Sequence, residues 1–191
     1  MRIIAGESRG RKIEAPSGKD TRPTLDRVRE NLFNIIRQDI QDARVLDLFA
    51  GSGALSLEAL SRGAASAVMV DADRKASMVQ RKNIALLGYG EKTKVYTCDW
   101  RSAVRMLRQE SFRFDLVFLD PPYRMAGLQE VFDGIAPLIT AESKVIYEHE
   151  AKQPFAMVSG FQCIKDRSWG YCGITIYQPA LHDGQDLKEE V

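Results

Sequence analysis

Apolar and polar residues follow two alternating spacings between about residue 43 and residue 150. Short runs rich in β-branched residues have the length of buried strands, and the segments between them repeat apolar residues at helical intervals. The predicted strands cover residues 43–49, 66–72, 94–98, 114–120 and 143–150, and the predicted helices cover residues 54–63, 74–88, 101–109 and 127–138. Strands separated by helices are joined by right-handed crossovers, so the pattern predicts an α/β fold with a doubly wound, Rossmann-like sheet.

The pattern changes at both ends of this region. Residues 160–179 read as two strands joined near Trp169 and Gly170, with too few residues between them for a helical crossover. One of the two strands must therefore lie antiparallel, which makes the predicted sheet mixed and seven-stranded. Before residue 40, apolar residues on one helical face and Pro23 in the first turn predict a helix. Residues 3–15 are typical of a short hairpin.

These elements predict three segments. Residues 1–40 form a small basic N-terminal extension of hairpin and helix, and residues 41–180 form the sheet domain. Residues 181–191 contain mostly polar and acidic residues, so we expect a disordered acidic tail.

The composition is typical of one globular domain. The chain has 191 residues, of which 45% are apolar and 28% are charged, so it can bury a core. No apolar run approaches the roughly 20 residues that span a bilayer, and the start lacks an apolar signal block, so we expect a cytoplasmic protein with no membrane partner. Three cysteines without CxxC spacing indicate neither a disulfide framework nor a metal site. We expect a monomer.

A glycine-rich turn follows the first predicted strand of the sheet domain. Gly51 and Gly53 stand between that strand and a helix, where doubly wound folds present backbone amides to nucleotide-like ligands. The third glycine of the dinucleotide fingerprint is replaced by Ser56, and Asp47 at the strand end would repel a pyrophosphate. A carboxylate there can instead accept a hydrogen bond from the ammonium group of an amino-acid-shaped ligand such as S-adenosylmethionine.

Further acids follow the next strands. Asp71 ends the second strand, 20 residues beyond Gly51, where it can accept ribose hydroxyls. Asp99 follows the third strand and can accept the adenine amino hydrogens, while Trp100 offers a backbone amide. Phe49 either faces the sulfonium as a cation–π partner or packs in the core. A single aspartate at a strand end is often only a turn or helix-capping residue. Aspartates after four successive strands, namely Asp47, Asp71, Asp99 and Asp120, favour a ligand site.

The fourth strand of this domain ends in the motif DPPY, Asp120 to Tyr123. Its two prolines fix two φ angles and donate no amide hydrogen, so the carbonyls between them are held rigidly. The Asp120 carboxylate and the Pro121 carbonyl can accept the two hydrogens of an exocyclic amine and direct its lone pair at a methyl donor. Pro122 stiffens the loop, and Tyr123 can stack on the base. The alternative is a proline-stiffened loop with a packed tyrosine.

Charge is uneven along the chain, although the net charge is only +1. Residues 1–29 contain eight Arg or Lys and four acids. Such a segment is either a solvated surface or a contact for nucleic-acid phosphates, and its position beside the sheet domain favours RNA. The candidate RNA contacts are Arg9, Arg11, Lys12, Arg22, Arg27 and Arg29.

The motifs together resemble the RsmD-type family of 16S rRNA guanine-N2 methyltransferases. They are RIIAGESRGRKI at the start, TRPTLDRVRENLFNII in the first helix, FAGSG in the glycine turn and DPPY, and the likeness extends to about residue 179. The resemblance implies a class I methyltransferase fold and S-adenosyl-L-methionine as methyl donor. It also implies the N2 amine of one guanine in 16S rRNA as acceptor, on an assembled or assembling small ribosomal subunit.

The resemblance also assigns site residues. The DPPY residues take the catalytic positions, and the cofactor contacts are Gly51, Gly53, Asp71 and Asp99. One departure concerns the ribose-binding acid, which is usually Glu in the family. The shorter Asp71 stands at that position here, and Asp73 is a possible contributor.

Other functions stay open from the sequence. An amine methyltransferase acting on DNA adenine or on a protein glutamine uses related motifs, but those usually begin with Asn where this chain has Asp120. A noncatalytic RNA-binding assembly factor is a second alternative, and a dehydrogenase is a third that Ser56 disfavours.

Overall fold

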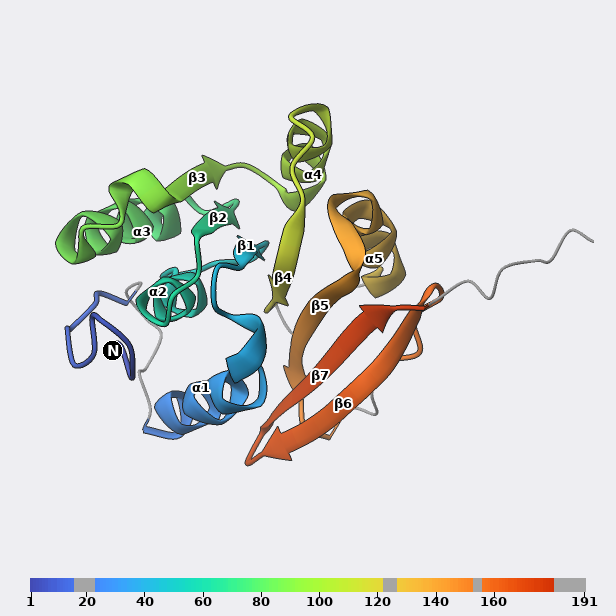
Figure 1. Cartoon of the computed structure of the whole chain (residues 1–191), viewed down its shortest axis with the longest axis horizontal. Helices are drawn as coiled ribbons and strands as arrows, with labels where there is room; N and C mark the ends of the chain where they lie inside the picture. The colour runs from blue at the N-terminus through green and yellow to red at the C-terminus, as the bar shows by residue number, and fades with distance from the viewer. Residues whose placement is uncertain (16–22, 122–126, 153–155, 181–191) are drawn as a thin grey trace, which may run out of the picture.

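A mixed sheet of seven strands forms the centre of the molecule (Figure 1). The structure is a computed structural model, and it describes residues 1–15, 23–121, 127–152 and 156–180. The strand order is β3-β2-β1-β4-β5-β7-β6. The strands are β1 (Arg44–Asp47), β2 (Ser66–Asp71), β3 (Thr93–Thr97), β4 (Phe114–Leu119), β5 (Ile139–Glu150), β6 (Phe161–Trp169) and β7 (Cys172–Pro179). The seven-stranded mixed sheet predicted from the sequence is thereby confirmed.

Helices cover both faces of the sheet (Figure 1). They are α1 (Pro23–Ile35), α2 (Ala54–Ser61), α3 (Arg74–Leu87), α4 (Trp100–Gln109) and α5 (Leu128–Ile135). Side chains of α1, α2 and α3 pack into one buried apolar cluster, and those of α4 and α5 pack into a second. Successive strand residues point to opposite faces, so Val45 enters the first cluster and Leu46 enters the second.

The last two strands make the sheet mixed. β7 pairs antiparallel with both β5 and β6, whereas the pairs β3–β2, β2–β1, β1–β4 and β4–β5 are parallel. The predicted turn at Trp169 and Gly170 joins β6 to β7, because the two residues between these strands allow only a hairpin. Residues 162–168 of β6 are exposed on both faces of this edge strand.

The first 15 residues lie against α2 and α3. A single antiparallel bridge joins Arg2 to Lys12, which is the minimal form of the predicted hairpin. Ile3 and Ile13 are buried in the first apolar cluster. Glu58 of α2, fully buried, accepts the backbone amides of Ile4 and Ala5 at 2.8 and 3.0 Å. The segment is therefore held by both apolar burial and charge-assisted hydrogen bonds.

None of the helices in the described part of the chain has the length and apolar character needed to cross a bilayer. Within residues 1–15, 23–121, 127–152 and 156–180, no three His, Cys, Asp or Glu side chains are placed to share a metal ion. The predicted tail, residues 181–191, lies outside the described residues.

Candidate active site

The candidate site lies at the carboxyl ends of the parallel strands. β1 pairs with β2 and β4, and Asp47, its last residue, stands opposite Met69 and Phe118. Asp71 ends β2, and Asp120 follows the end of β4. Because these strands are parallel, their carboxyl ends meet at one edge, where doubly wound sheets bind ligands. The glycine turn and the start of DPPY therefore lie side by side.

The two glycines of the turn have left-handed backbones, with φ +53° at Gly51 and +78° at Gly53. A Cβ atom on Gly53 would lie 2.9 Å from the sulfur of Met69, so the turn packs tightly on β2 at this point. A Cβ atom on Gly51 would meet nothing within 4 Å. Gly51 therefore borders open space above the sheet edge, as a turn that presents its backbone to a ligand requires.

Asp47 is a buried carboxylate, and its side chain is 1% exposed. Its Oδ2 atom accepts a hydrogen bond from the Ser56 hydroxyl at 3.0 Å, whereas Oδ1 has no hydrogen-bond partner among the described residues. Burial raises the pKa of Asp47 to about 7; the Ser56 hydrogen bond opposes this shift, and the nearby charges of Asp120 and Asp71 add to it. The buried unpaired oxygen is a position where a ligand group or water would be expected to donate.

Asp71 already holds the local backbone together. Its Oδ2 atom accepts the amide of Gly51 at 2.8 Å, and its Oδ1 atom accepts the amide of Asp73 at 2.8 Å. Asp73 in turn caps α3 by accepting the amide of Lys75. A carboxylate oxygen has a second lone pair, so Asp71 keeps acceptor capacity for a ribose hydroxyl while it fixes the glycine turn.

Asp99 is the N-cap residue of α4 and is exposed. Its carboxylate accepts the amide of Ser102 at 3.1 Å and the Ser102 hydroxyl at 2.6 Å, and these bonds lower the pKa of Asp99. Trp100 begins α4, with the Arg101 guanidinium 4.4 Å from its ring centroid. Phe49 is half-buried and packs against the second apolar cluster. Asp99 therefore does cap a helix, and Phe49 does pack in the core, which are the alternatives to ligand binding that the sequence left open.

The DPPY motif is described only in part. Asp120 is half-buried and Pro121 is buried. Asp120 lies close enough to Asp47 for its charge to act on that carboxyl group. Pro122 and Tyr123 lie outside the described residues.

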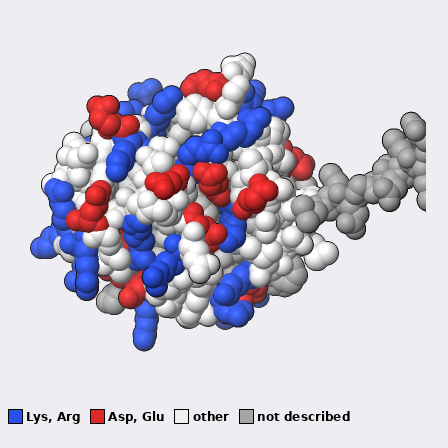
Figure 2. Space-filling model, viewed as in Figure 1, with Lys and Arg blue, Asp and Glu red and all other residues white. Residues whose placement is uncertain are grey.

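The basic residues divide into two groups. Arg9, Arg11, Lys12 and Arg27 are exposed, and Figure 2 shows Lys and Arg side chains at the left edge, where Figure 1 places the N-terminal segment. Arg11 also donates to the carbonyls of Leu86 and Leu87 at the end of α3. Arg22 lies outside the described residues.

Arg29 requires a correction. Its side chain is only 7% exposed and donates to the carbonyl of Arg2 at 2.6 Å and to Asp26 at 3.0 Å. Burial lowers the pKa of this guanidinium. Arg29 therefore ties α1 to the N-terminal segment, and it does not face solvent where a phosphate could reach it. Arg29 is therefore not a candidate RNA contact.

Sequence reasoning missed three residues that organise the site. In the sequence Ser56 stands only where the dinucleotide fingerprint has a glycine, yet in the structure its hydroxyl donates to Asp47. Glu58 holds the N-terminal segment, and its one sequence signal is a carboxylate inside the otherwise uncharged helix ALSLEALS. Asn83, also buried, joins Glu14 to the Ser52 carbonyl in the glycine turn. No local pattern marks Asn83, because its partners are distant in sequence.

Solved structures share this fold. The putative methyltransferase yhhF from Escherichia coli superposes with a TM-score of 0.82 at 35% identity, covering 94% of this chain and 97% of that chain. SMU.776, a putative methyltransferase complexed with SAH, has the same fold at a TM-score of 0.65 and 13% identity, covering 81% of this chain and 49% of that chain. The strand order and these likenesses establish the class I methyltransferase fold.

Relatives match along most of the sequence. Putative rRNA methyltransferase YlbH from Bacillus subtilis is 34% identical, covering 93% of this chain and 98% of the relative. Ribosomal RNA small subunit methyltransferase D from Haemophilus influenzae is 32% identical, covering 93% of each chain. The family model described as Conserved hypothetical protein 95 matches residues 1–178. The chain therefore belongs to this family, together with the proteins named ribosomal RNA small subunit methyltransferase D, as its motifs predicted.

Proposed function

We propose that this protein transfers a methyl group from S-adenosyl-L-methionine to the exocyclic N2 amine of a guanine in 16S rRNA. The names of its relatives support rRNA of the small subunit as substrate class. The DPPY motif, which begins with Asp rather than Asn, supports guanine as the acceptor base.

One observation carries the proposal. The Asp47 carboxylate, with one buried unpaired oxygen, and the Asp120 carboxylate stand at the ends of adjacent parallel strands, within electrostatic reach of each other. Two carboxylates that approach each other in a buried setting oppose each other's ionisation. Capping a turn or a helix does not require such an approach. A cationic ligand between the glycine turn and DPPY would relieve this repulsion.

The residues fit S-adenosylmethionine chemically. The ammonium group can donate to the unpaired Oδ1 atom of Asp47, and the ligand can occupy the open space beside Gly51. Asp71 and Asp99 are the acceptors for the ribose and the adenine amine, and Asp71 keeps the turn in place by holding the Gly51 amide. When bound, the cofactor supplies an electrophilic methyl group on a sulfonium.

The task left to the protein is to orient a poor nucleophile. The lone pair of a guanine amine is delocalised into the ring, so the nitrogen must become pyramidal before it can attack. Asp120 and the Pro121 carbonyl accept its two hydrogens and direct the lone pair, and Tyr123 stacks on the base. The proton leaves after methyl transfer, so the reaction needs no strong general base beforehand.

The exposed basic residues of the N-terminal segment and α1 provide the RNA contacts in this proposal. Arg9, Arg11, Lys12 and Arg27 are positioned to meet phosphates, and each neutralised phosphate adds to the salt dependence of binding. The partner is the assembled or assembling small ribosomal subunit. RNA of this kind presents unpaired bases that an enzyme can take out of the stack.

The test uses labelled S-adenosylmethionine and small ribosomal subunits that lack the modification. Wild-type protein should incorporate label, and nucleoside mass spectrometry should find N2-methylguanosine. Asp120→Ala should lower kcat by about 10²-fold or more, a typical loss for one oriented polar group in an active site. Cofactor affinity by calorimetry should fall much less, because Asp47 and the glycine turn are retained.

Asp133→Ala is the matched control, because Asp133 is exposed on α5 and interacts only with Gln129 among the described residues. It should react like wild type. Equal activity of Asp120→Ala and wild type would refute the proposed mechanism. Tight subunit binding without methyl incorporation would favour the noncatalytic assembly factor.

A further inference from the structure

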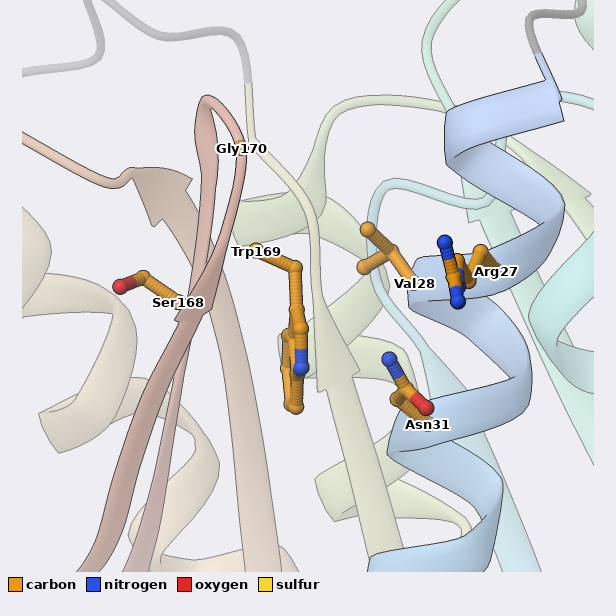
Figure 3. A pocket seen from close by; sticks show the side chains of 6 residues that line it. All are labelled: Arg27, Val28, Asn31, Ser168, Trp169 and Gly170. Carbon is orange, nitrogen blue, oxygen red and sulfur yellow. The ribbon is translucent and has the colours of Figure 1, made fainter.

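A pocket opens between α1 and the tip of the β6–β7 hairpin (Figure 3). It has a volume of about 590 Å³, within the range of about 300–1,000 Å³ that is usual for small-ligand sites. The helix contributes Arg27, Val28 and Asn31, and the hairpin contributes Ser168, Trp169 and Gly170. Figure 3 shows the Trp169 ring and the Asn31 amide facing each other across the opening, whereas the Ser168 hydroxyl points away from it.

Both elements that line this pocket, α1 and the β6–β7 hairpin, lie near the end of β4. Phe33 of α1 contacts Phe118 of β4, with ring centroids 5.9 Å apart, and Phe118 is two residues before Asp120. Trp169 pairs across the hairpin with Cys172. Cys172 also stands opposite Glu150 of β5, and Tyr147 of the same strand stands opposite Leu119, the residue before Asp120, so the tip of the hairpin lies near the end of β4. The pocket therefore lies beside the proposed methyl-transfer position.

The lining has the chemistry of a nucleotide site. Trp169 is half-buried against the core and offers an aromatic face, and such a face stacks with any base. Asn31 carries both a donor and an acceptor, which match the edge of a base. Arg27 is exposed at the same opening and can meet a phosphate. A dry apolar pocket would lack these last two groups.

We propose that this pocket binds the nucleotide next to the methylated guanine on the same RNA strand, with its base stacked on Trp169 and its edge read by Asn31. The inference rests on the proposed function. Asp120 and Pro121 are not among the residues that line the pocket, so the pocket flanks the target position and does not contain it. A strand that delivers its guanine to Asp120 would place an adjacent nucleotide between α1 and the hairpin.

The experiment measures equilibrium binding of unmodified small ribosomal subunits and, separately, of S-adenosylmethionine. Trp169→Ala should bind subunits about 5- to 150-fold more weakly, the loss expected for one stacked base, and Trp169→Phe should recover most of it. Asn31→Ala, which changes only a half-buried helix residue, should bind about 2- to 10-fold more weakly. Cofactor affinity should not change in these variants.

Ile164→Ala is the matched control on the same hairpin, because Ile164 is exposed on β6 and does not line the pocket. It should bind like wild type. If Trp169→Ala and Asn31→Ala both bind subunits as tightly as wild type, the pocket assignment is overturned. If the wild type transfers no methyl group but Trp169→Ala still weakens subunit binding selectively, the proposed reaction fails, and the pocket stands as a nucleotide site without its place beside a methylated guanine.

Discussion

Replacing Asp47 with Asn should separate the stability of the protein from its affinity for the cofactor. Burial raises the pKa of Asp47 from 3.8 to about 7. A difference of one in pKa corresponds to 1.36 kcal/mol, so ionising this buried carboxyl group destabilises the ligand-free fold by about 4 kcal/mol. Asn has nearly the same shape, can still accept the Ser56 hydroxyl, and carries no charge to desolvate.

The sign of the pH dependence follows from linkage. Because the folded pKa of Asp47 is raised, the unfolded chain releases this proton near pH 3.8, whereas the folded protein keeps it until about pH 7. The stability associated with the protonated group is fully present below pH 3.8 and is lost as the pH rises through 7. The advantage of Asp47→Asn should therefore grow by about 1.4 kcal/mol per pH unit across this window and level off above it.

Urea unfolding of both proteins without cofactor, at pH 4, 6 and 8, measures this difference. Ser56→Ala provides a second check, because losing the hydrogen bond that opposes the shift should move the upper end of the window above pH 7. Calorimetry at pH 8 should show weaker binding of S-adenosylmethionine to Asp47→Asn, since the ammonium loses its charged acceptor. An equal free-energy difference at pH 4 and pH 8 would refute the reasoning.

Three other substitutions test the framework of the site. Glu58→Ala should lower the free energy of unfolding by about 3–5 kcal/mol, because it leaves the buried partners of this carboxylate unpaired. Hydrogen exchange at the Ile4 amide should accelerate. Unchanged exchange would contradict this role. Gly53→Ala should destabilise the protein more than Gly51→Ala, because both have positive φ but only the Gly53 Cβ would press on Met69 at 2.9 Å. Gly51→Ala should instead weaken cofactor binding, because its Cβ would enter the space proposed for the ligand. Urea unfolding and calorimetry compare the two, and equal losses of stability would argue against the close packing at Gly53.

Much of the fold followed from periodicity. The alternation of apolar strands with helical patterns predicted five of the seven strands, and the short connection near Trp169 predicted the other two as an antiparallel pair. Parallel strands place their carboxyl ends together, so the strand-end acids Asp47, Asp71 and Asp120 were expected at one edge from local patterns alone. The strand order does not follow from local patterns, because it depends on which strand edges meet and pair through backbone hydrogen bonds in the folded chain.

Individual roles at the site depended on contacts that no local pattern encodes. Arg29 and Arg27 are two residues apart on one helix, yet packing buries Arg29 under the N-terminal segment and leaves Arg27 at the pocket. Asp99 caps α4 by accepting a backbone amide of its first turn, a role that the sequence could offer only as an alternative.

The sequence by itself determined the α/β class, the glycine turn and the family, because these depend on residue periodicity and on motifs that are contiguous in the chain. Only the tertiary structure decided that Glu58 holds the N-terminal segment and that Trp169 faces Asn31, since each pair joins residues more than 50 positions apart. The burial and the hydrogen bonds of these side chains depend on residues that are distant in the sequence, so they are decided only when the chain packs.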